Sequence, residues 1–188
     1  MLNFVQYDVN DAPAASRALL EQVQKAMGFV PNLIATMAES PAVLAGYLAL
    51  DANLGSGALS AAERQIVEIA VSTQNGCEYC VAAHSTVASM LRVDPQILRQ
   101  VRDEVVVKDP KIEALVRFTR TVMQSRGFVE GSAFADFLAA GYGKKHLLEV
   151  AGHIGLKTLA NYVHALSHAP LDARFEAQKV DRAEAAAR

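Results

Sequence analysis

The chain has 188 residues, of which 52% are hydrophobic, so it is long enough and apolar enough to bury a core as one domain. Its 18 basic and 20 acidic residues give a formal net charge of −2, with no long block of either sign. We therefore expect neither nucleic acid nor an anionic membrane as a partner. Residues 1–11 lack a basic start followed by an apolar run, and charged and polar residues interrupt the longest apolar segment, 147–166. We expect a cytoplasmic protein without a membrane span.

Helix start and stop signals recur along the chain, whereas the sustained alternation of polar and apolar residues that is typical of strands is absent. We therefore predict an all-α fold, built as a single-domain helical bundle over residues 1–188. The predicted helices, in chain order, run from Asp11–Pro13 to near Gly28, from Ser40–Pro41 to about Ala52, from Ser60 to about Thr73, from about Cys77 to Leu91, from Asp94–Pro95 as a short helix, from Asp109–Pro110 to Gly127, from Ser132 to Gly141, and from about Lys144 to His168.

Particular residues mark some of these boundaries. Ser60 and Glu63 have the spacing of a capping box, in which each side chain binds the backbone amide of the other residue. Asn75, after this helix, is a candidate cap for the next one. Residues 176–188 are rich in Ala, Arg, Glu and Asp, which predicts an exposed tail.

The chain has two cysteines, Cys77 and Cys80, and His84 follows four residues later. On a helix these three side chains share one face. Peroxides and disulfides are attacked by thiolates, and a helix N-terminus lowers a thiol pKa from its usual value of about 8.5. His84 could accept or return the proton, and a second thiol could trap a sulfenic acid as a disulfide. The segment therefore indicates thiol redox chemistry.

Other uses of a Cys-x-x-Cys segment need a different context. Haem attachment requires a histidine directly after the second cysteine, where this chain has Val81, and a thioredoxin-like site requires a βαβ setting. Zinc stays open, because Cys77, Cys80 and His84 could be three ligands, but the fourth would have to come from a distant histidine or carboxylate. The two cysteines could also be small buried hydrophobic residues without chemistry.

A longer motif surrounds the cysteines. The sequence LSAAERQIV at residues 59–67, followed by VS at 71–72 and NGCEYCVAAH at 75–84, resembles the core of the alkylhydroperoxidase D-like proteins of the carboxymuconolactone decarboxylase superfamily. Looser similarities extend the resemblance over about residues 28–175. It implies an all-helical protein that assembles as a trimer or hexamer and reduces hydroperoxides with its thiols. The enzyme would act as an antioxidant, use no cofactor or metal, and be recycled by an external dithiol.

The resemblance also implies roles for individual residues. Cys80 would attack the peroxide, Cys77 would be the resolving thiol, and His84 would belong to the proton relay. The family relay has a glutamate twelve residues before the first cysteine, where this chain has Gln65, which cannot take a proton. Glu68 lies one turn further and could serve as the base on the same side of the helix, or Gln65 could hold a water molecule against the thiol.

The long helix predicted after Lys144 carries further polar residues. His153 and His164 are eleven residues apart and so lie on nearly the same face, where they could line a pocket, bind metal or be satisfied core or interface residues. Asn161 and Tyr162 allow a substrate-binding or a structural role. The apolar stripes within 42–54 and 147–166 exceed what one small bundle needs, which favours a homo-oligomer.

These observations together predict a thiol-dependent peroxidase with Cys80, Cys77, His84, Gln65 and Glu68 as its site residues. One alternative is a decarboxylase or lyase that acts on a small lactone acid, for which cysteine-to-serine variants would keep activity. The other is a zinc-binding or redox-sensing protein without turnover.

Overall fold

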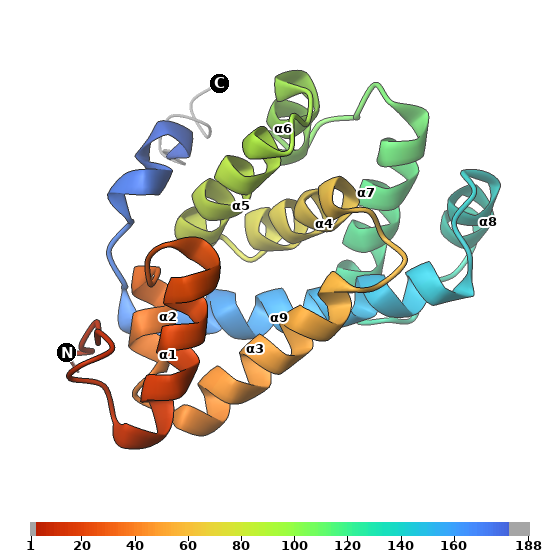
Figure 1. The fold of residues 1–188 in the computed structure, drawn as a ribbon. Coiled ribbons are helices and arrows are strands. Elements are labelled where there is room, and N and C mark those ends of the chain that lie inside the picture. The colour runs from red at the N-terminus through yellow and green to blue at the C-terminus, as the bar shows by residue number, and fades with distance from the viewer. Residues whose placement is uncertain (1–2, 181–188) are drawn as a thin grey trace.

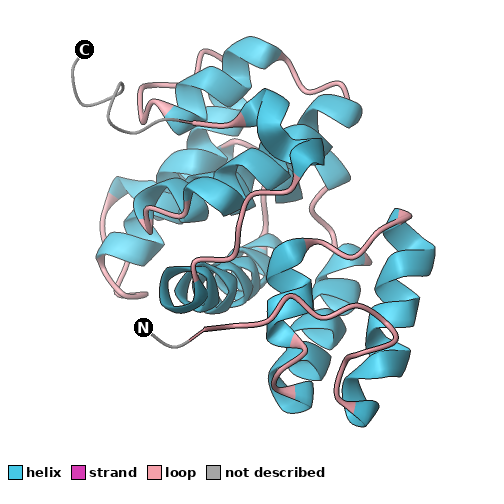
Figure 2. Cartoon of the chain, turned by 90° about the vertical axis from the view of Figure 1, so that its left-hand side faces the viewer, coloured by secondary structure: helices cyan, strands magenta, loops and turns pink. Residues whose placement is uncertain are grey.

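The protein is described by a computed structural model that covers residues 3–180, and within that range every regular element is a helix (Figures 1 and 2). The predicted all-α, single-domain fold is confirmed for these residues. The elements are α1 (Ala14–Met27), α2 (Asn32–Met37), α3 (Pro41–Gly55), α4 (Ala61–Gln74), α5 (Glu78–Met90), α6 (Pro95–Arg102), α7 (Pro110–Gln124), α8 (Ser132–Ala139), α9 (Lys144–Ser167) and a 3₁₀ helix, η1 (Ala173–Gln178).

Most helices begin where their sequence signals predict. At the start of α4 the Ser60 hydroxyl accepts the Glu63 amide N–H at 3.2 Å and the Glu63 carboxylate accepts the Ser60 amide N–H at 2.8 Å, so the capping box is confirmed. At α6 and α7 the Asp94 and Asp109 carboxylates accept amide N–H groups of the first turn. Local chemistry therefore fixes these boundaries.

The start of α5 differs from the prediction, because its cap is Cys77 and not Asn75. Gly76, with a φ of +72°, makes a left-handed turn after α4, so that Cys77 comes directly before the first helical residue. The Cys77 Sγ accepts the amide N–H of Cys80 at 3.4 Å. Asn75 instead donates its side-chain N–H to Asn161 Oδ1 on α9, at 2.9 Å. A thiol of the pair thus takes the capping position.

Helix α4 is the centre of the bundle. It packs against α5, α7 and α9 (Figure 1), and all of its residues from Ile66 to Thr73 are buried. A helix buried on all sides has no solvent face for its polar residues. Because buried polar groups need partners, a residue such as Glu68 must be satisfied inside the protein.

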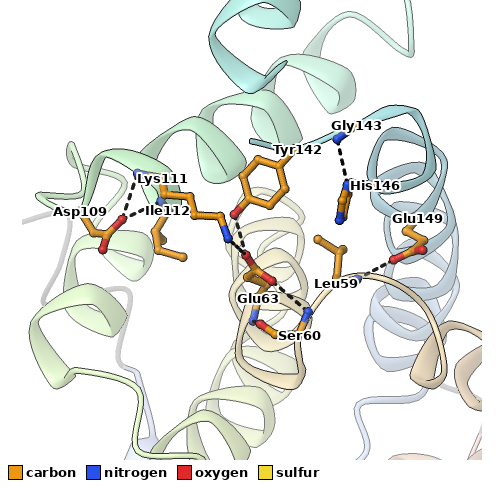
Figure 3. A network of polar contacts seen from close by, with 10 residues as sticks. All are labelled: Leu59, Ser60, Glu63, Asp109, Lys111, Ile112, Tyr142, Gly143, His146 and Glu149. Atoms are coloured by element: carbon orange, nitrogen blue, oxygen red, sulfur yellow. Dashed lines mark hydrogen bonds and ion pairs between the residues drawn. The ribbon is translucent and has the colours of Figure 1, made fainter. Parts of the chain in front are cut away.

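A polar network fixes the N-terminal end of α4 (Figure 3). The Glu63 carboxylate accepts a hydrogen bond from the Tyr142 hydroxyl at 2.9 Å and pairs with Lys111 Nζ at 2.9 Å. Burial raises the pKa of Glu63, but its hydrogen bonds outweigh that effect and lower the pKa to about 2. Nearby, the Glu149 carboxylate on α9 accepts the amide N–H of Leu59 at 2.8 Å. Helices α7 and α9 therefore hold α4 in a set position.

The residues after α9 fold back along α5. Element η1 packs against that helix, and Phe175 is buried. Gln178 accepts a hydrogen bond from Arg102 at 3.0 Å and donates one to Ser89 at 3.3 Å. Of the predicted exposed tail, residues 176–180 are exposed or half-buried, and residues 181–188 lie outside the described part of the chain.

One face of α9 is apolar and uncovered in the single chain. Leu148, Leu159, Tyr162 and Leu166 are 76%, 38%, 61% and 74% exposed. Their spacings of eleven, three and four residues correspond to about three turns, one turn and one turn, so they lie on one stripe. Within α3 only Leu44 is fully buried. These exposed surfaces keep the homo-oligomer as a prediction. None of the helices in residues 3–180 is long and apolar enough to cross a membrane.

Candidate active site

The two thiols meet at the start of α5. Cys77 caps the helix and Cys80 lies in its first turn, with the two Sγ atoms 2.7 Å apart. Both cysteines are free thiols and are only 3% and 2% exposed. A pair in direct contact needs little rearrangement to close as a disulfide.

The pair carries its charge unequally. Hydrogen bonds from the Cys80 thiol, from His164 and from the Cys80 amide lower the pKa of Cys77 to about 5, although burial opposes them. The contact with Cys77, together with burial, raises the pKa of Cys80 well above its usual value. A second negative charge beside the first is unfavourable. At neutral pH the pair therefore holds one negative charge, on Cys77, and one proton.

Helix α9 turns a polar face toward the thiols and α4. His153, Lys157, Asn161 and His164 follow one another at intervals of four, four and three residues, so they form one stripe. The prediction that His153 and His164 share a face is thus confirmed. His164 is hydrogen-bonded to Cys77, which raises the His164 pKa, and Asn161 is hydrogen-bonded to Cys80. His164 Nε2 also contacts the Ala169 carbonyl at 3.2 Å, so Nε2 donates there and Nδ1 is left for the thiol.

His84 joins α4, α5 and α9. Its Nδ1 lies 2.8 Å from Glu68 Oε2 and 2.9 Å from Gln65 Oε1, and its Nε2 lies 2.7 Å from Lys157 Nζ. A lysine ammonium only donates hydrogen bonds, so Nε2 accepts and Nδ1 carries the ring proton. Gln65 and Glu68 therefore face the same side of α4, as predicted, and both hold the imidazole. Each ring nitrogen of His84 already has a partner.

Lys157 is a buried ammonium, 2% exposed, that also donates a hydrogen bond to the Tyr47 hydroxyl at 2.9 Å. Burial lowers its pKa, but Tyr47, Glu68 and Cys80 outweigh burial and raise the pKa above its usual value. In turn, burial raises the pKa of Glu68, and His84, His153 and Lys157 together hold it well below the usual range. The cluster therefore balances one carboxylate against one ammonium.

Glu68 has a second imidazole partner. His153 Nδ1 lies 2.9 Å from Glu68 Oε1, and His153 is itself 2% exposed. Both carboxylate oxygens of Glu68 are thus hydrogen-bonded to histidines, one on α5 and one on α9. This arrangement satisfies the buried charge and fixes the orientation of His84.

A cavity of about 300 Å³ reaches Cys80. Its wall is mainly apolar and is supplied by α1, the α2 segment, α5 and η1, with residues such as Met27, Ile34 and Phe175. Its polar wall is the cluster just described, and Met27, 45% exposed, brings the cavity to the surface. An apolar pocket with a few polar groups beside a thiol is the usual form of a small-molecule site.

Six polar residues line one side of the cavity, and two of them, Tyr47 and Asp51, lie on α3. The six are Tyr47, Asp51, Gln65, Glu68, His84 and Lys157. Burial raises the pKa of Asp51, with Glu68 adding to the effect and Lys157 opposing it. Cys80 lies on the cavity wall, whereas the charged thiol, Cys77, lies behind it next to His164.

Tyr79, between the cysteines, ties the C-terminal segment to the site. Its hydroxyl donates to Asp172 Oδ2 at 2.5 Å and accepts the Leu33 amide N–H at 3.2 Å. Its ring stacks on His164 with 5.2 Å between centroids and meets Phe175 edge-on at 6.0 Å. The residue therefore positions both the first turn of α5 and the imidazole that contacts Cys77.

The residues of the zinc hypothesis do not form a ligand set. In residues 3–180 no group of three or more His, Cys, Asp or Glu side chains is placed to hold a metal ion. His84 turns its two nitrogens to Glu68, Gln65 and Lys157. The Cys77, Cys80 and His84 triad proposed from spacing therefore lacks a free imidazole.

Tyr47, Asp51 and Lys157 are the residues of the polar wall that the sequence analysis missed. Lys157 stands four residues from both His153 and Asn161 on α9. That periodicity was the available signal, since a polar stripe on a buried helix needs partners. Its partners could not be read from local sequence, because Tyr47 is 110 residues away.

Comparison with known proteins agrees with this fold. Residues 41–121, which include α3 to α5 and both thiols, match the sequence profile of the carboxymuconolactone decarboxylase family. Over these residues the chain is similar to members of that family. No curated protein sequence matches the chain significantly.

Solved structures with a similar fold match nearly the whole chain. An uncharacterized peroxidase-related protein from Ralstonia eutropha JMP134, described as an alkylhydroperoxidase AhpD core, is 24% identical, with a TM-score of 0.82 over 92% of this chain and 93% of its own. A peroxidase-related protein from Silicibacter sp. TM1040 is 23% identical, with a TM-score of 0.79 over 94% of each chain. At these identities the likeness establishes an alkylhydroperoxidase D-like fold.

A third structure carries a different activity. The debrominase Bmp8, as its C82A variant in complex with 2,3,4-tribromopyrrole, is 18% identical, with a TM-score of 0.77 over 95% of each chain. Proteins with this fold therefore include a peroxidase-related protein and a debrominase. Function in this chain has to be argued from its own site.

Proposed function

We propose that the protein is a thiol-dependent peroxidase that reduces an organic hydroperoxide at Cys80, with Cys77 as the resolving thiol. The observation that carries this proposal is the position of the two thiols at the cavity. Cys80 lies on the cavity wall, and the charged thiol of Cys77 contacts Cys80 from the side away from the cavity. The apolar wall suits the carbon body of an organic hydroperoxide. The contact between the thiols suits rapid disulfide closure.

The reaction begins with one proton and one negative charge on the pair. The Cys80 proton moves to Cys77 across the 2.7 Å contact, which leaves a thiolate on the cavity wall. This thiolate attacks the terminal oxygen of the hydroperoxide, the O–O bond breaks, and a sulfenic acid forms on Cys80 as the alkoxide leaves with a proton. Sulfur is oxidised and the peroxide is reduced to an alcohol.

The second step uses Cys77. Its sulfur attacks the Cys80 sulfenic acid, the S–S bond forms, and the sulfenic hydroxyl leaves with the Cys77 proton as water. His164, hydrogen-bonded to Cys77, stabilises the negative charge that develops on this sulfur. Two thiols and one hydroperoxide thus give a disulfide, an alcohol and water.

A reductant has to reopen the disulfide. An external dithiol that enters the cavity would attack Cys80 and expel Cys77, because the thiol of lower pKa is the better leaving group. We place this cycle in the reducing cytoplasm as an antioxidant activity. The exposed apolar stripe on α9 and the small buried share of α3 support a homo-oligomer, for which the resemblance suggests a trimer or hexamer.

The same thiol pair supports a second candidate, the reductive removal of a halogen from an aromatic substrate. The debrominase Bmp8 shares the fold, and the apolar cavity could hold a small aromatic ring. In that reaction two thiols and an aryl halide would give the arene, a halide ion, a proton and a disulfide. Halide release by the reduced protein is the distinguishing measurement.

The test is single-turnover oxidation of the fully reduced, metal-free protein by cumene hydroperoxide, with thiol loss and disulfide formation followed in the parent, Cys80→Ser and Cys77→Ser. We expect fast loss of both thiols in the parent, no fast phase in Cys80→Ser, and a sulfenic acid that persists in Cys77→Ser. Thiols that react no faster than free cysteine would refute the proposal. Activity on a lactone acid in both serine variants would favour the lyase, and oxidation without turnover would favour a redox sensor.

A further inference from the structure

The peroxide step leaves an alkoxide that needs a proton inside a largely apolar cavity. Two groups on the polar wall are poor donors: Glu68 is a carboxylate, and the ring proton of His84 is directed at Glu68 and Gln65. The Tyr47 hydroxyl accepts a hydrogen bond from Lys157, and burial raises its pKa. Lys157 is the one cation among the residues that line the cavity within the described part of the chain.

We propose that Lys157 protonates the leaving alkoxide and that its positive charge stabilises the thiolate on Cys80. The proposal rests on the proposed peroxidase function and adds a proton donor to it. An ammonium has three N–H groups. Two of them are directed to the Tyr47 hydroxyl and to His84 Nε2, at 2.9 and 2.7 Å, so one stays available to the cavity that Lys157 lines.

The neighbours of Lys157 hold it as an ammonium before each turnover. The titratable groups that face it come from four helices and are Tyr47 and Asp51 on α3, Glu68 on α4, Cys80 and His84 on α5, and His153 on α9. Glu68 supplies the opposing charge through His84, whose Nδ1–H it binds at 2.8 Å. His84 and Glu68 are therefore positioning residues for Lys157 in this scheme.

The proton balance of the step is complete. The Cys80 thiolate takes the terminal OH of the hydroperoxide as the O–O bond breaks, and a Lys157 N–H bond gives its proton to the alkoxide. The products are a sulfenic acid, a neutral alcohol and a neutral lysine amine. The amine then regains a proton from water after the alcohol leaves the cavity.

Oxidants with different leaving groups distinguish the two roles of Lys157, proton donation and stabilisation of the thiolate. A peroxyacid expels a carboxylate, which needs no proton, whereas an alkyl hydroperoxide expels a strongly basic alkoxide. We would measure the rate of Cys80 oxidation by peracetic acid and by tert-butyl hydroperoxide in the parent, Lys157→Met and Lys157→Arg. Lys145→Met, an exposed lysine on the same helix, is the matched control. An arginine keeps the charge but does not release a proton in proteins.

We expect Lys157→Arg to lose about 100-fold or more in rate with the alkyl hydroperoxide and to keep a near-parental rate with the peroxyacid. Lys157→Met should be slower with both, because its thiolate is also less stable. Equal loss with both oxidants in Lys157→Arg, or no loss with either, would overturn the role of proton donor. Asp51→Asn tests the other cavity acid, and a loss in that variant alone would assign the proton to Asp51.

Alkylation tests the charge role without any peroxide. In a Cys77→Ser background, the rate of Cys80 alkylation by iodoacetamide rises with pH as the thiolate forms. We expect Lys157→Met to move the midpoint upward by about one pH unit or more, and Lys145→Met to leave it in place. A midpoint that does not move would overturn the role of Lys157 in stabilising the Cys80 thiolate. If the parent protein alkylates normally but does not react with any peroxide, only the proposed peroxidase function is refuted. Should the Lys157 variants fail to fold, a parental rate that is nearly independent of leaving-group basicity supports the donor, and a steep dependence refutes it.

Discussion

The hydroxyl of Tyr79 is expected to contribute about 2–4 kcal/mol to the stability of the fold. Tyr79→Phe removes a hydrogen bond of 2.5 Å to the buried Asp172 carboxylate, and a hydrogen bond to a charged group contributes about 1.5–3 kcal/mol. It also leaves the Leu33 amide N–H, 3.2 Å from that oxygen, without its acceptor, at a cost of about 1–3 kcal/mol. Partial relaxation of the segment brings the sum to the stated range, because Asp172 keeps the Asn32 amide, 3.2 Å from each oxygen.

Thermal unfolding of the reduced protein measures this loss. For a chain of this size, 2–4 kcal/mol corresponds to a decrease in Tm of about 4–16 °C. Tyr162→Phe is the matched control, because Tyr162 is 61% exposed on α9. A double-mutant cycle with Asp172→Asn should return a coupling of about 1.5–3 kcal/mol. A Tm equal to that of the control would refute the reasoning, and since phenylalanine keeps the ring stack on His164, the Cys77 ionisation should not move.

Four other predictions concern the ionised groups and their partners. The thiolate absorbance of the reduced protein should vanish as the pH falls through about 5, and His164→Gln should move that midpoint upward, because His164 lowers the pKa of Cys77. Glu68→Gln should destabilise the protein by about 3–5 kcal/mol at neutral pH in urea unfolding; because the folded pKa of Glu68 is depressed, this difference is present above its ordinary pKa and shrinks as the pH falls. In one peroxide assay the rate of thiol oxidation should be lower in Glu68→Gln than in either the parent or Gln65→Glu. Equal rates in all three proteins would remove both residues from the mechanism. Glu63→Gln should cost about 1 kcal/mol after solvent screening, a difference that is complete above pH 4.5 and disappears toward pH 2 in pH-dependent unfolding.

The parts of the fold that the sequence predicted are those set by neighbouring residues. The capping box of Ser60 and Glu63 needs three residues of spacing, and the common side of Gln65 and Glu68 needs one helical turn. The predicted cap of α5, Asn75, was wrong by two residues, because the turn at Gly76 decides whether Asn75 or Cys77 comes next to the helix. Local rules give the helix but do not fix the backbone of the turn before it.

The rest of the site depends on contacts between distant segments. Lys157 meets His84 across 73 residues, and Tyr79 meets Asp172 across 93. No spacing rule predicts such pairs, although the polar stripe on α9 shows that partners must exist. The sequence therefore identified the thiols and the histidine, while the cation and the anchoring carboxylate required the three-dimensional arrangement.

In the proposed cycle, one group of the site can release a proton while another supplies one. In the reduced state the negative charge on Cys77 raises the pKa of His164 through their hydrogen bond. Disulfide formation removes that charge, so the His164 pKa falls and the imidazole releases its proton more readily. The proposed cycle consumes one proton, which Lys157 gives to the alkoxide. His164 and Lys157 lie seven residues apart on the same face of α9. The group that releases a proton beside Cys77 and the group that needs one beside Cys80 are therefore part of one polar stripe. Reduction of the disulfide should accordingly depend on pH more steeply in the parent than in His164→Gln.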